Sequence, residues 1–160
     1  LSNSSARLLI LGSYPGVTSL AQSQYYAHPR NMFWDIMSEL IQFNRGLDYQ
    51  KRISALQAAG IALWDVLYSC KRAGSLDAKI VSPSIVINDF ENFFQIHPLI
   101  RTIVFNGAKA EQEFNKRVVP VAVQMIGSKQ CLRVPSTSPA MASMSYREKV
   151  QRWRLILDHL

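Results

Sequence analysis

The chain has 160 residues, of which 48% are hydrophobic and 18% are charged, as expected for one globular domain that buries a core without disulfides or metals. No apolar run approaches the ~20 residues of a membrane-spanning helix, and no signal-peptide pattern opens the chain, so we expect a cytoplasmic protein. The formal net charge of +7 favours a polyanionic partner without identifying it.

Four short apolar runs, at residues 8–11, 61–63, 102–105 and 131–134, are predicted as buried strands. Helical patterns cover residues 30–42, 48–59 and 108–117, and a further helical segment lies near 88–96. Strands that alternate with helices predict a parallel sheet covered on both faces. We therefore expect one domain over residues 1–160, an α/β fold in the form of a three-layer α/β/α sandwich with a central, mainly parallel four-stranded sheet.

Several helix ends carry capping signals. Asn88 with Glu91, and Ser145 with Glu148, have the spacing of a capping box. Gly60 lies where a glycine would end the second helix. The last helix should present one apolar face, formed by Val150, Trp153 and Leu157.

The connection after the first strand, residues 12–29, is longer than the ~2–6 residues usual for such loops. It contains two glycines, two prolines and three aromatic residues. Loops of this composition hold ligands at the carboxyl ends of parallel strands. Asp65, which follows the second strand, should face the same crevice.

The loop at residues 135–144, PSTSPAMASM, should lie at the same edge of the sheet. Its hydroxyls and free amides suit phosphate oxygens, although a solvated turn has the same composition. Residues 109–160 hold nine Lys or Arg against four acids. The basic residues expected near this loop are Lys129, Arg133, Arg147, Lys149, Arg152 and Arg154.

Other chemistries find no support in the sequence. Cys70 and Cys131 form no CxxC or Cys/His cluster, so reduced thiols are expected and a disulfide is the alternative. The three histidines lack metal-ligand spacing. No GxSxG, GxxxxGK[ST] or HExxH motif indicates an unrelated hydrolase or a nucleotide-binding protein.

Four ordered motifs resemble those of the uracil-DNA glycosylase superfamily. They are GSYPG at residues 12–16, AHPRNMFW at 27–34, VFNGAKA at 104–110 and VPSTSPA at 134–140. The form of the second and fourth motifs is most similar to the deoxyinosine (hypoxanthine) glycosylase branch, which is related to the mismatch-specific uracil/thymine glycosylases. The motifs span most of the chain.

The resemblance implies a monofunctional DNA glycosylase of base excision repair that flips out a deaminated base, hypoxanthine and/or uracil, and hydrolyses its N-glycosidic bond. It implies damaged DNA as the partner, no metal or cofactor, no membrane, and a monomer. No lysine is placed to form a Schiff base, so no lyase activity is expected. A catalytically weak or silent lesion-binding protein of the same fold is the alternative.

The resemblance also assigns the base site. Tyr26 takes the place of the stacking aromatic residue, with Tyr25 as the alternative. Gly12 is a candidate for contact with the base, and the topology makes Asp65 a candidate polar neighbour of the base. Asn31 is implicated in catalysis, because an amide can meet the lactam edge of a deaminated base. A helix N-cap is the other interpretation of Asn31.

Tyr14 departs from the superfamily pattern, since other branches often have Asp or Asn there to place the attacking water. A phenol with a pKa of ~10 is a poor general base at neutral pH. We therefore expect dissociative departure of the base, with water held near Ser13 or Asn31. Tyr14 is a candidate catalytic residue that could instead shape the pocket.

The resemblance makes residues 135–141 the DNA-contacting loop. Ser136, Thr137 and Ser138 would hold phosphates between the stiffening Pro135 and Pro139. Ala140 or Met141 would fill the gap left by the flipped nucleotide, although Met141 could equally pack inside. His28 would contact phosphate or support Asn31, and a structural role is the alternative.

Overall fold

The computed structural model of the protein describes all 160 residues. Its central sheet contains four parallel strands in the order β2-β1-β5-β6. Their bounds are β1 Leu8–Gly12, β2 Ile61–Asp65, β5 Thr102–Asn106 and β6 Gln130–Val134. Each predicted strand is present, and the predicted four-stranded parallel sheet is confirmed.

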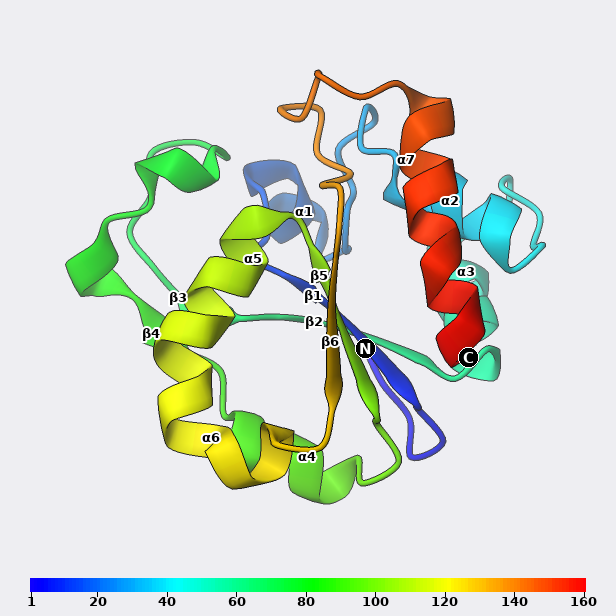
Figure 1. The fold of residues 1–160 in the computed structure, drawn as a ribbon. Coiled ribbons are helices and arrows are strands. Elements are labelled where there is room, and N and C mark those ends of the chain that lie inside the picture. Colours follow the sequence, from blue (N-terminus) through cyan, green and yellow to red (C-terminus); the bar gives the residue numbers. More distant parts are fainter.

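Helices cover both faces of this sheet, which confirms the three-layer sandwich (Figure 1). Strand side chains alternate in direction, so Leu9 and Leu11 face one layer while Leu8 and Ile10 face the other. The first layer contains α4 (Phe90–Ile96), α5 (Ala108–Glu113) and α6 (Val119–Ile126). The second contains α2 (Phe33–Leu40), α3 (Tyr49–Ala58) and α7 (Tyr146–Trp153).

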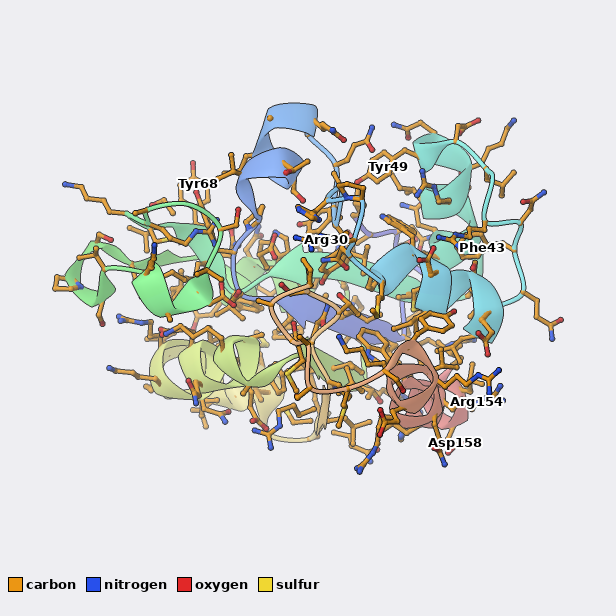
Figure 2. The ribbon with its side chains drawn as sticks, turned by 90° about the horizontal axis from the view of Figure 1, so that it is seen from above. Arg30, Phe43, Tyr49, Tyr68, Arg154 and Asp158 are labelled. Carbon is orange, nitrogen blue, oxygen red and sulfur yellow. The ribbon has the colours of Figure 1, made fainter.

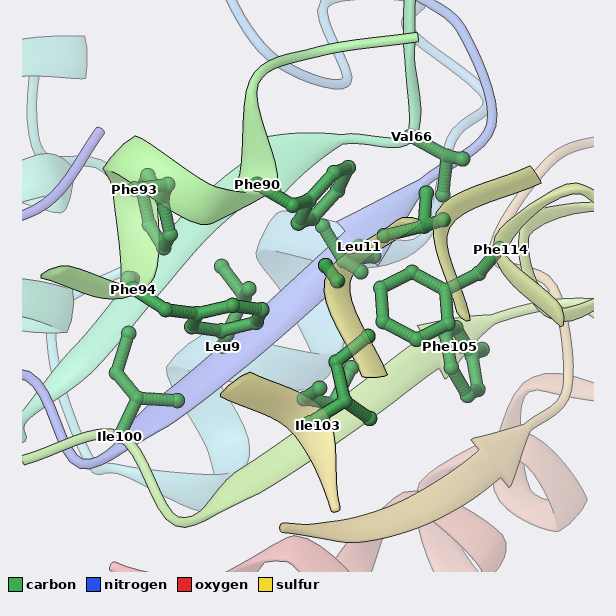
Figure 3. Packing of buried hydrophobic residues seen from close by; sticks show 14 of the residues in the cluster. Leu9, Leu11, Val66, Phe90, Phe93, Phe94, Ile100, Ile103, Phe105 and Phe114 are labelled. Carbon is green, nitrogen blue, oxygen red and sulfur yellow. The ribbon is translucent and has the colours of Figure 1, made fainter. Parts of the chain in front are cut away.

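Aromatic side chains fill the space between the sheet and the first layer. Figure 3 shows Phe90 and Phe94 of α4 packed with Phe114 beside strand residues such as Leu9 and Phe105. Phe114 is fully buried and meets Phe90 edge-on, with 5.3 Å between ring centroids. Full burial of such a side chain contributes roughly 1.5–3 kcal/mol, so this layer holds the sheet firmly in place.

The capping predictions are confirmed at two helices and wrong at a third. Ser145 and Glu148 form the predicted capping box of α7, and Gly60 follows α3 with a φ of 76°. The box predicted for Asn88 and Glu91 is wrong, because Asp89 caps α4. Asn88 instead donates from Nδ2 to the carbonyl of Asp65 at 2.8 Å, which ties it to the end of β2.

The apolar face predicted for the last helix is correct for Val150 and Trp153 and wrong for Leu157. After α7 the chain tightens into a 3₁₀ helix, Arg154–His159, which has about 3.0 residues per turn. The tighter winding turns Ile156 into the core and leaves Leu157 38% exposed.

Some elements were not predicted. A short helix, α1 (Val17–Gln22), interrupts the first connection. Strands β3 (Leu67–Ser69) and β4 (Val86–Ile87) form a separate antiparallel pair. The helix expected at 108–117 continues to Ile126 through a π-helical turn, Phe114–Val118, because Pro120 at the start of α6 has no N–H to donate.

All four strands run in the same direction, so their carboxyl ends meet at the edge drawn at the top of Figure 1. The 135–144 loop, α1 and the 23–32 segment lie along this edge, and the 70–85 segment between β3 and β4 lies beside them. Figure 2 looks down on the edge and shows Arg30 over the sheet. No helix is long and apolar enough to cross a membrane.

Candidate active site

A cavity of about 340 Å³ opens at this edge of the sheet. Both loops singled out in the sequence contribute to it, and the N–H of Met32 donates to the carbonyl of Thr137 at 3.0 Å, which joins them directly. Among the predicted site residues, those that line the cavity are Gly12, Ser13, Tyr14, Tyr26, His28, Asn31, Asp65, Ser136, Thr137, Ser138 and Pro139. Pro135 and Met141 are not among the lining residues.

Asp65 and Gly12 form the floor of the cavity, at paired positions of β2 and β1. A Cβ atom on Gly12 would overlap with Oδ1 of Asp65 and lie 3.4 Å from the hydroxyl of Tyr26, so any other residue here would displace the Asp65 carboxyl group. Asp65 is 7% exposed. This burial raises the pKa of Asp65 to about 7, although the nearby Tyr25 hydroxyl opposes the shift. The floor therefore holds a carboxyl group that changes charge near neutral pH.

Tyr26 is held in a restricted position. Its φ of 54° lies in the left-handed region, which is uncommon for a residue other than glycine. Its ring stacks on Phe33 with a centroid distance of 4.1 Å and an interplanar angle of 26°. The hydroxyl is buried without a hydrogen-bond partner, and burial raises the pKa of Tyr26. The result is a rigid aromatic surface, backed by Phe33, at the wall of the cavity.

Asn31 is not the N-cap of α2, which is Met32, but it lies directly before that residue. Its Oδ1 accepts a hydrogen bond from the N–H of Phe33 at 3.0 Å, at the start of α2. Its own N–H donates to the carbonyl of His28 at 2.8 Å. The side chain also lines the cavity, so its Nδ2 amino group is the part available to a ligand.

The 135–144 loop is anchored to the end of β5. Asn106 donates from Nδ2 to Oγ1 of Thr137 and accepts from the Thr137 N–H, both at 2.9 Å. Thr137 is fully buried, and its hydroxyl oxygen and its N–H both pair with the Asn106 side chain. Ser136 and Ser138 are partly exposed, and the N–H of Ser138 donates to Oγ of Ser136 at 3.2 Å.

Lys149 lies against this loop, as expected, but it is not on the surface. It is fully buried, and its Nζ donates to the carbonyl of Met141 at 2.8 Å. Lys129 precedes β6, at the opposite end of the strand from the loop, and donates to the carbonyl of Ile100 at 2.7 Å. The expected position near the loop is therefore correct for Lys149 and wrong for Lys129.

Two of the predicted arginines are engaged by acids. Nη1 of Arg133 lies 2.8 Å from Oε2 of Glu111, and Nη2 of Arg154 lies 3.5 Å from Oε1 of Glu39. Arg147 and Arg152 are exposed and form no ion pair.

The 70–85 segment adds residues to the site that sequence reasoning missed. Oγ of Ser13 donates to Oδ2 of Asp77 at 2.8 Å, and Asp77 lines the cavity together with Ser75. The guanidinium group of Arg72 lies 5.0 Å from the centroid of the Tyr14 ring. In sequence this segment has the composition of an ordinary surface loop, and no motif marks it.

Three comparisons show which known proteins the chain is similar to. A family model described as the uracil DNA glycosylase superfamily matches residues 1–158. Hypoxanthine DNA glycosylases of Methanosarcina barkeri and Methanosarcina acetivorans are 39% and 40% identical over 104 residues. Each match covers 64% of this chain and 65% of the relative, just under two thirds of its length.

A solved structure extends the similarity to nearly the whole fold. The solution NMR structure of a proposed uracil DNA glycosylase from Methanosarcina acetivorans has a TM-score of 0.76 and 32% sequence identity. The similarity covers 97% of this chain and 93% of that chain.

Proposed function

Because the chain belongs to the uracil DNA glycosylase superfamily, we propose that it is a monofunctional DNA glycosylase that excises a deaminated base, hypoxanthine above all. The names of the two curated relatives support hypoxanthine as the first substrate to test. The observation that carries the proposal is the convergence of Tyr26, Asn31 and the 135–144 loop on one cavity. Uracil is a second candidate substrate, since it presents the same lactam edge.

Tyr26 provides the stacking surface for the flipped base. A base that leaves the duplex loses its neighbours, and stacking on an aromatic ring returns roughly 1–3 kcal/mol. Phe33 supports one face of the Tyr26 ring at 4.1 Å, so the opposite face receives the base. Because the backbone and the stack fix this ring, little conformational entropy is lost on binding.

Asn31 and Asp65 read the edge of the base. Hypoxanthine and uracil present a carbonyl where adenine and cytosine present an amino group. The Nδ2 amino group of Asn31 is a donor, so it matches the carbonyl and opposes the amino group. Asp65, when ionised, adds an acceptor for the ring N–H at the floor. An undamaged base leaves these buried groups unpaired, which is the physical source of the selectivity.

Bond cleavage follows a dissociative course. The electron pair of the N-glycosidic bond leaves with the base, and the sugar becomes oxocarbenium-like. The Asn31 amino group stabilises the negative charge that develops on the base. The Tyr14 ring, packed beneath Arg72, forms the wall of the cavity, while Ser13 lies where a water molecule must approach.

The 135–144 loop contacts the DNA around the extruded nucleotide. Ser136 and Ser138 and their backbone amides bind phosphates, while Thr137 anchors the loop through Asn106. Pro135 and Pro139 stiffen it, and Ala140 or Met141 fills the gap in the stack.

Other features of the proposed enzyme follow from the same site. His28 contributes a phosphate contact beside Asn31. The chain acts as a monomer in the cytoplasm, without a metal or a cofactor.

A base-excision assay tests the proposal. The purified protein is incubated with duplexes that contain hypoxanthine, uracil or xanthine, and abasic sites are revealed by alkaline cleavage. We expect abasic sites at hypoxanthine. Binding of the lesion duplex with no cleavable product after long incubation would instead establish a silent lesion-binding protein.

A further inference from the structure

The GSYPG loop at residues 12–16 carries no carboxylate, yet the hydrolysis proposed above needs a group that places and deprotonates water. The 70–85 segment brings a carboxylate to that loop. We propose that Asp77 is a catalytic residue, which binds the attacking water from the β3–β4 segment and so replaces an acid at position 14. This inference rests on the proposed glycosylase activity.

The 70–85 segment is docked onto the first loop by several independent contacts. The side chain of Arg72 is 3% exposed, lies over the Tyr14 ring and donates through Nη2 to the carbonyl of Pro15. The N–H of Val17 donates to Oγ of Ser75 at 3.0 Å. These contacts join the 70–85 segment to Tyr14, Pro15 and Val17 of the first connection. They therefore fix the position of Asp77 relative to the GSYPG loop.

The Asp77 carboxylate is held in place by neighbouring residues and can still accept a further hydrogen bond. Oδ2 accepts from the Ser13 hydroxyl at 2.8 Å, and Oδ1 lies 3.6 Å from Nη1 of Arg72. The side chain remains 40% exposed and lines the cavity, so water can reach it. Asp65, the other acid in the cavity, is only 7% exposed and lies at the floor, where a base would cover it. Asp77 is therefore the carboxylate that can hold a water molecule.

The charges around Asp77 suit a proton acceptor. Burial raises the pKa of Asp77, while the Ser13 hydrogen bond and the positive charges of Arg72 and Lys109 oppose the shift. Glu113 and Asp65 are the acids that face it, and Glu113 is itself paired with Lys109 at 2.7 Å. A carboxylate whose pKa is raised accepts a proton more readily than an ordinary surface aspartate.

The step balances without any further reactant. As the C1′–N bond breaks, its electron pair goes to the base. The water oxygen forms a bond to C1′, and one water proton moves to the Asp77 carboxylate. The departing base takes up one proton from solvent, and Asp77 returns its proton to solvent, so that one water is consumed for each base released.

Asp77→Asn tests this role, because it removes the basic oxygen but keeps the size of the side chain and an acceptor for Ser13. Asp158→Asn is the matched control, since Asp158 is exposed and lies away from the cavity (Figure 2). Single-turnover excision of hypoxanthine should slow ~100-fold or more in Asp77→Asn, in line with general-base contributions of about 10²–10⁴. Affinity for the intact lesion duplex and the melting temperature should stay close to those of the control.

A second variant separates chemistry from structure. Asp77→Ala leaves space for a small carboxylate, so added formate should restore part of the excision rate in that variant only. If Asp77→Asn proves unstable, the formate experiment on Asp77→Ala tests the proposal instead. An excision rate that formate does not raise would contradict the proposal. If Asp77→Asn excises the base at the wild-type rate, the role of Asp77 is refuted but the glycosylase function is not. If the wild-type protein itself excises no base, the glycosylase function is refuted.

Discussion

Asn31 shows how one side chain at this site serves the fold and the ligand together. Its Oδ1 accepts from the N–H of Phe33, the first residue of α2, and the same amide lines the cavity. Phe33 in turn supports the Tyr26 ring. The helix start, the stacking surface and the proposed donor are therefore held by neighbouring contacts, so each position is fixed by the others.

The two halves of the Asn31 amide can be separated by substitution. Asn31→Asp keeps an oxygen for the Phe33 N–H but loses the amino donor, whereas Asn31→Ala loses both. We expect both variants to lose most turnover, and only Asn31→Ala to lose stability, by ~1 kcal/mol. Single-turnover rates and urea unfolding measure the two effects. A wild-type rate in Asn31→Asp would show that the amino group is not used.

Asp65 makes the stability of the protein depend on pH. Burial raises its pKa from the ordinary 3.8 to about 7, so the folded state holds the proton more tightly than the unfolded chain. The associated stability is complete below the unfolded pKa and is lost as the pH rises through the folded pKa. The free energy of unfolding should therefore contain a contribution that falls between about pH 4 and 7, on the order of a few kcal/mol.

Asp65→Asn tests this contribution, because the neutral amide cannot ionise in the buried position. Urea unfolding across this pH range should show a weaker decline for Asp65→Asn than for the wild type. Asp158→Asn, at an exposed position, should follow the wild-type curve. Parallel curves for Asp65→Asn and the wild type would mean that Asp65 ionises as an ordinary surface acid.

Among the elements, α7 links the core to the 135–144 loop. Its Trp153 is fully buried and donates from Nε1 to the carbonyl of Pro135 at 2.9 Å. Its Lys149 donates to the carbonyl of Met141. One helix therefore holds both ends of residues 135–141, which explains why the chain buries a lysine there.

The capping box of α7 should contribute measurably to stability. Ser145→Ala removes the side-chain acceptor of the Glu148 N–H and should lower the free energy of unfolding by ~1 kcal/mol. Ser5→Ala, at an exposed position outside any helix or strand, is the control. Urea unfolding at neutral pH measures the stability of both variants. Equal stability of Ser145→Ala and Ser5→Ala would show that water satisfies the Glu148 N–H as well as the Ser145 side chain does.

At the scale of the whole molecule, four parallel strands bring their carboxyl ends to one edge, where the proposed function requires DNA to approach. The net charge of +7 favours this encounter. Arg30 lies in the first connection, between the cavity-lining His28 and Asn31, and it is exposed. It is therefore well placed to meet a phosphate, although its position in the sequence did not single it out for that contact.

The salt dependence of DNA binding should distinguish exposed from buried cations. Arg30→Gln should lower the slope of log affinity against log salt by ~0.9, as expected for one lost phosphate contact. Lys149→Met should leave this slope unchanged, because the buried ammonium group meets only a carbonyl. Fluorescence anisotropy over a salt series measures both slopes. A reduced slope in Lys149→Met would place that residue on the DNA.

The sequence by itself determined the local features of this protein. Apolar runs and helical periodicity indicated the four strands and most helices, because these patterns reflect burial at each position. The Ser145–Glu148 box was predictable because a cap depends on residues three apart. The position of residues 12–29 and 135–144 around one cavity was predictable as well, because parallel strands place their connections at one edge.

Tertiary structure alone decided which distant segments meet. The pairing of β3 with β4 turns the 70–85 segment over the first loop, and Asp77 reaches Ser13 across 64 positions of the chain. Lys149 is buried because the 135–144 loop folds over it, although a charged lysine side chain is normally found on the surface. Such contacts arise from packing between elements, and no local spacing in the sequence encodes them. The sequence therefore indicated the cavity residues of the two loops but not those of the 70–85 segment.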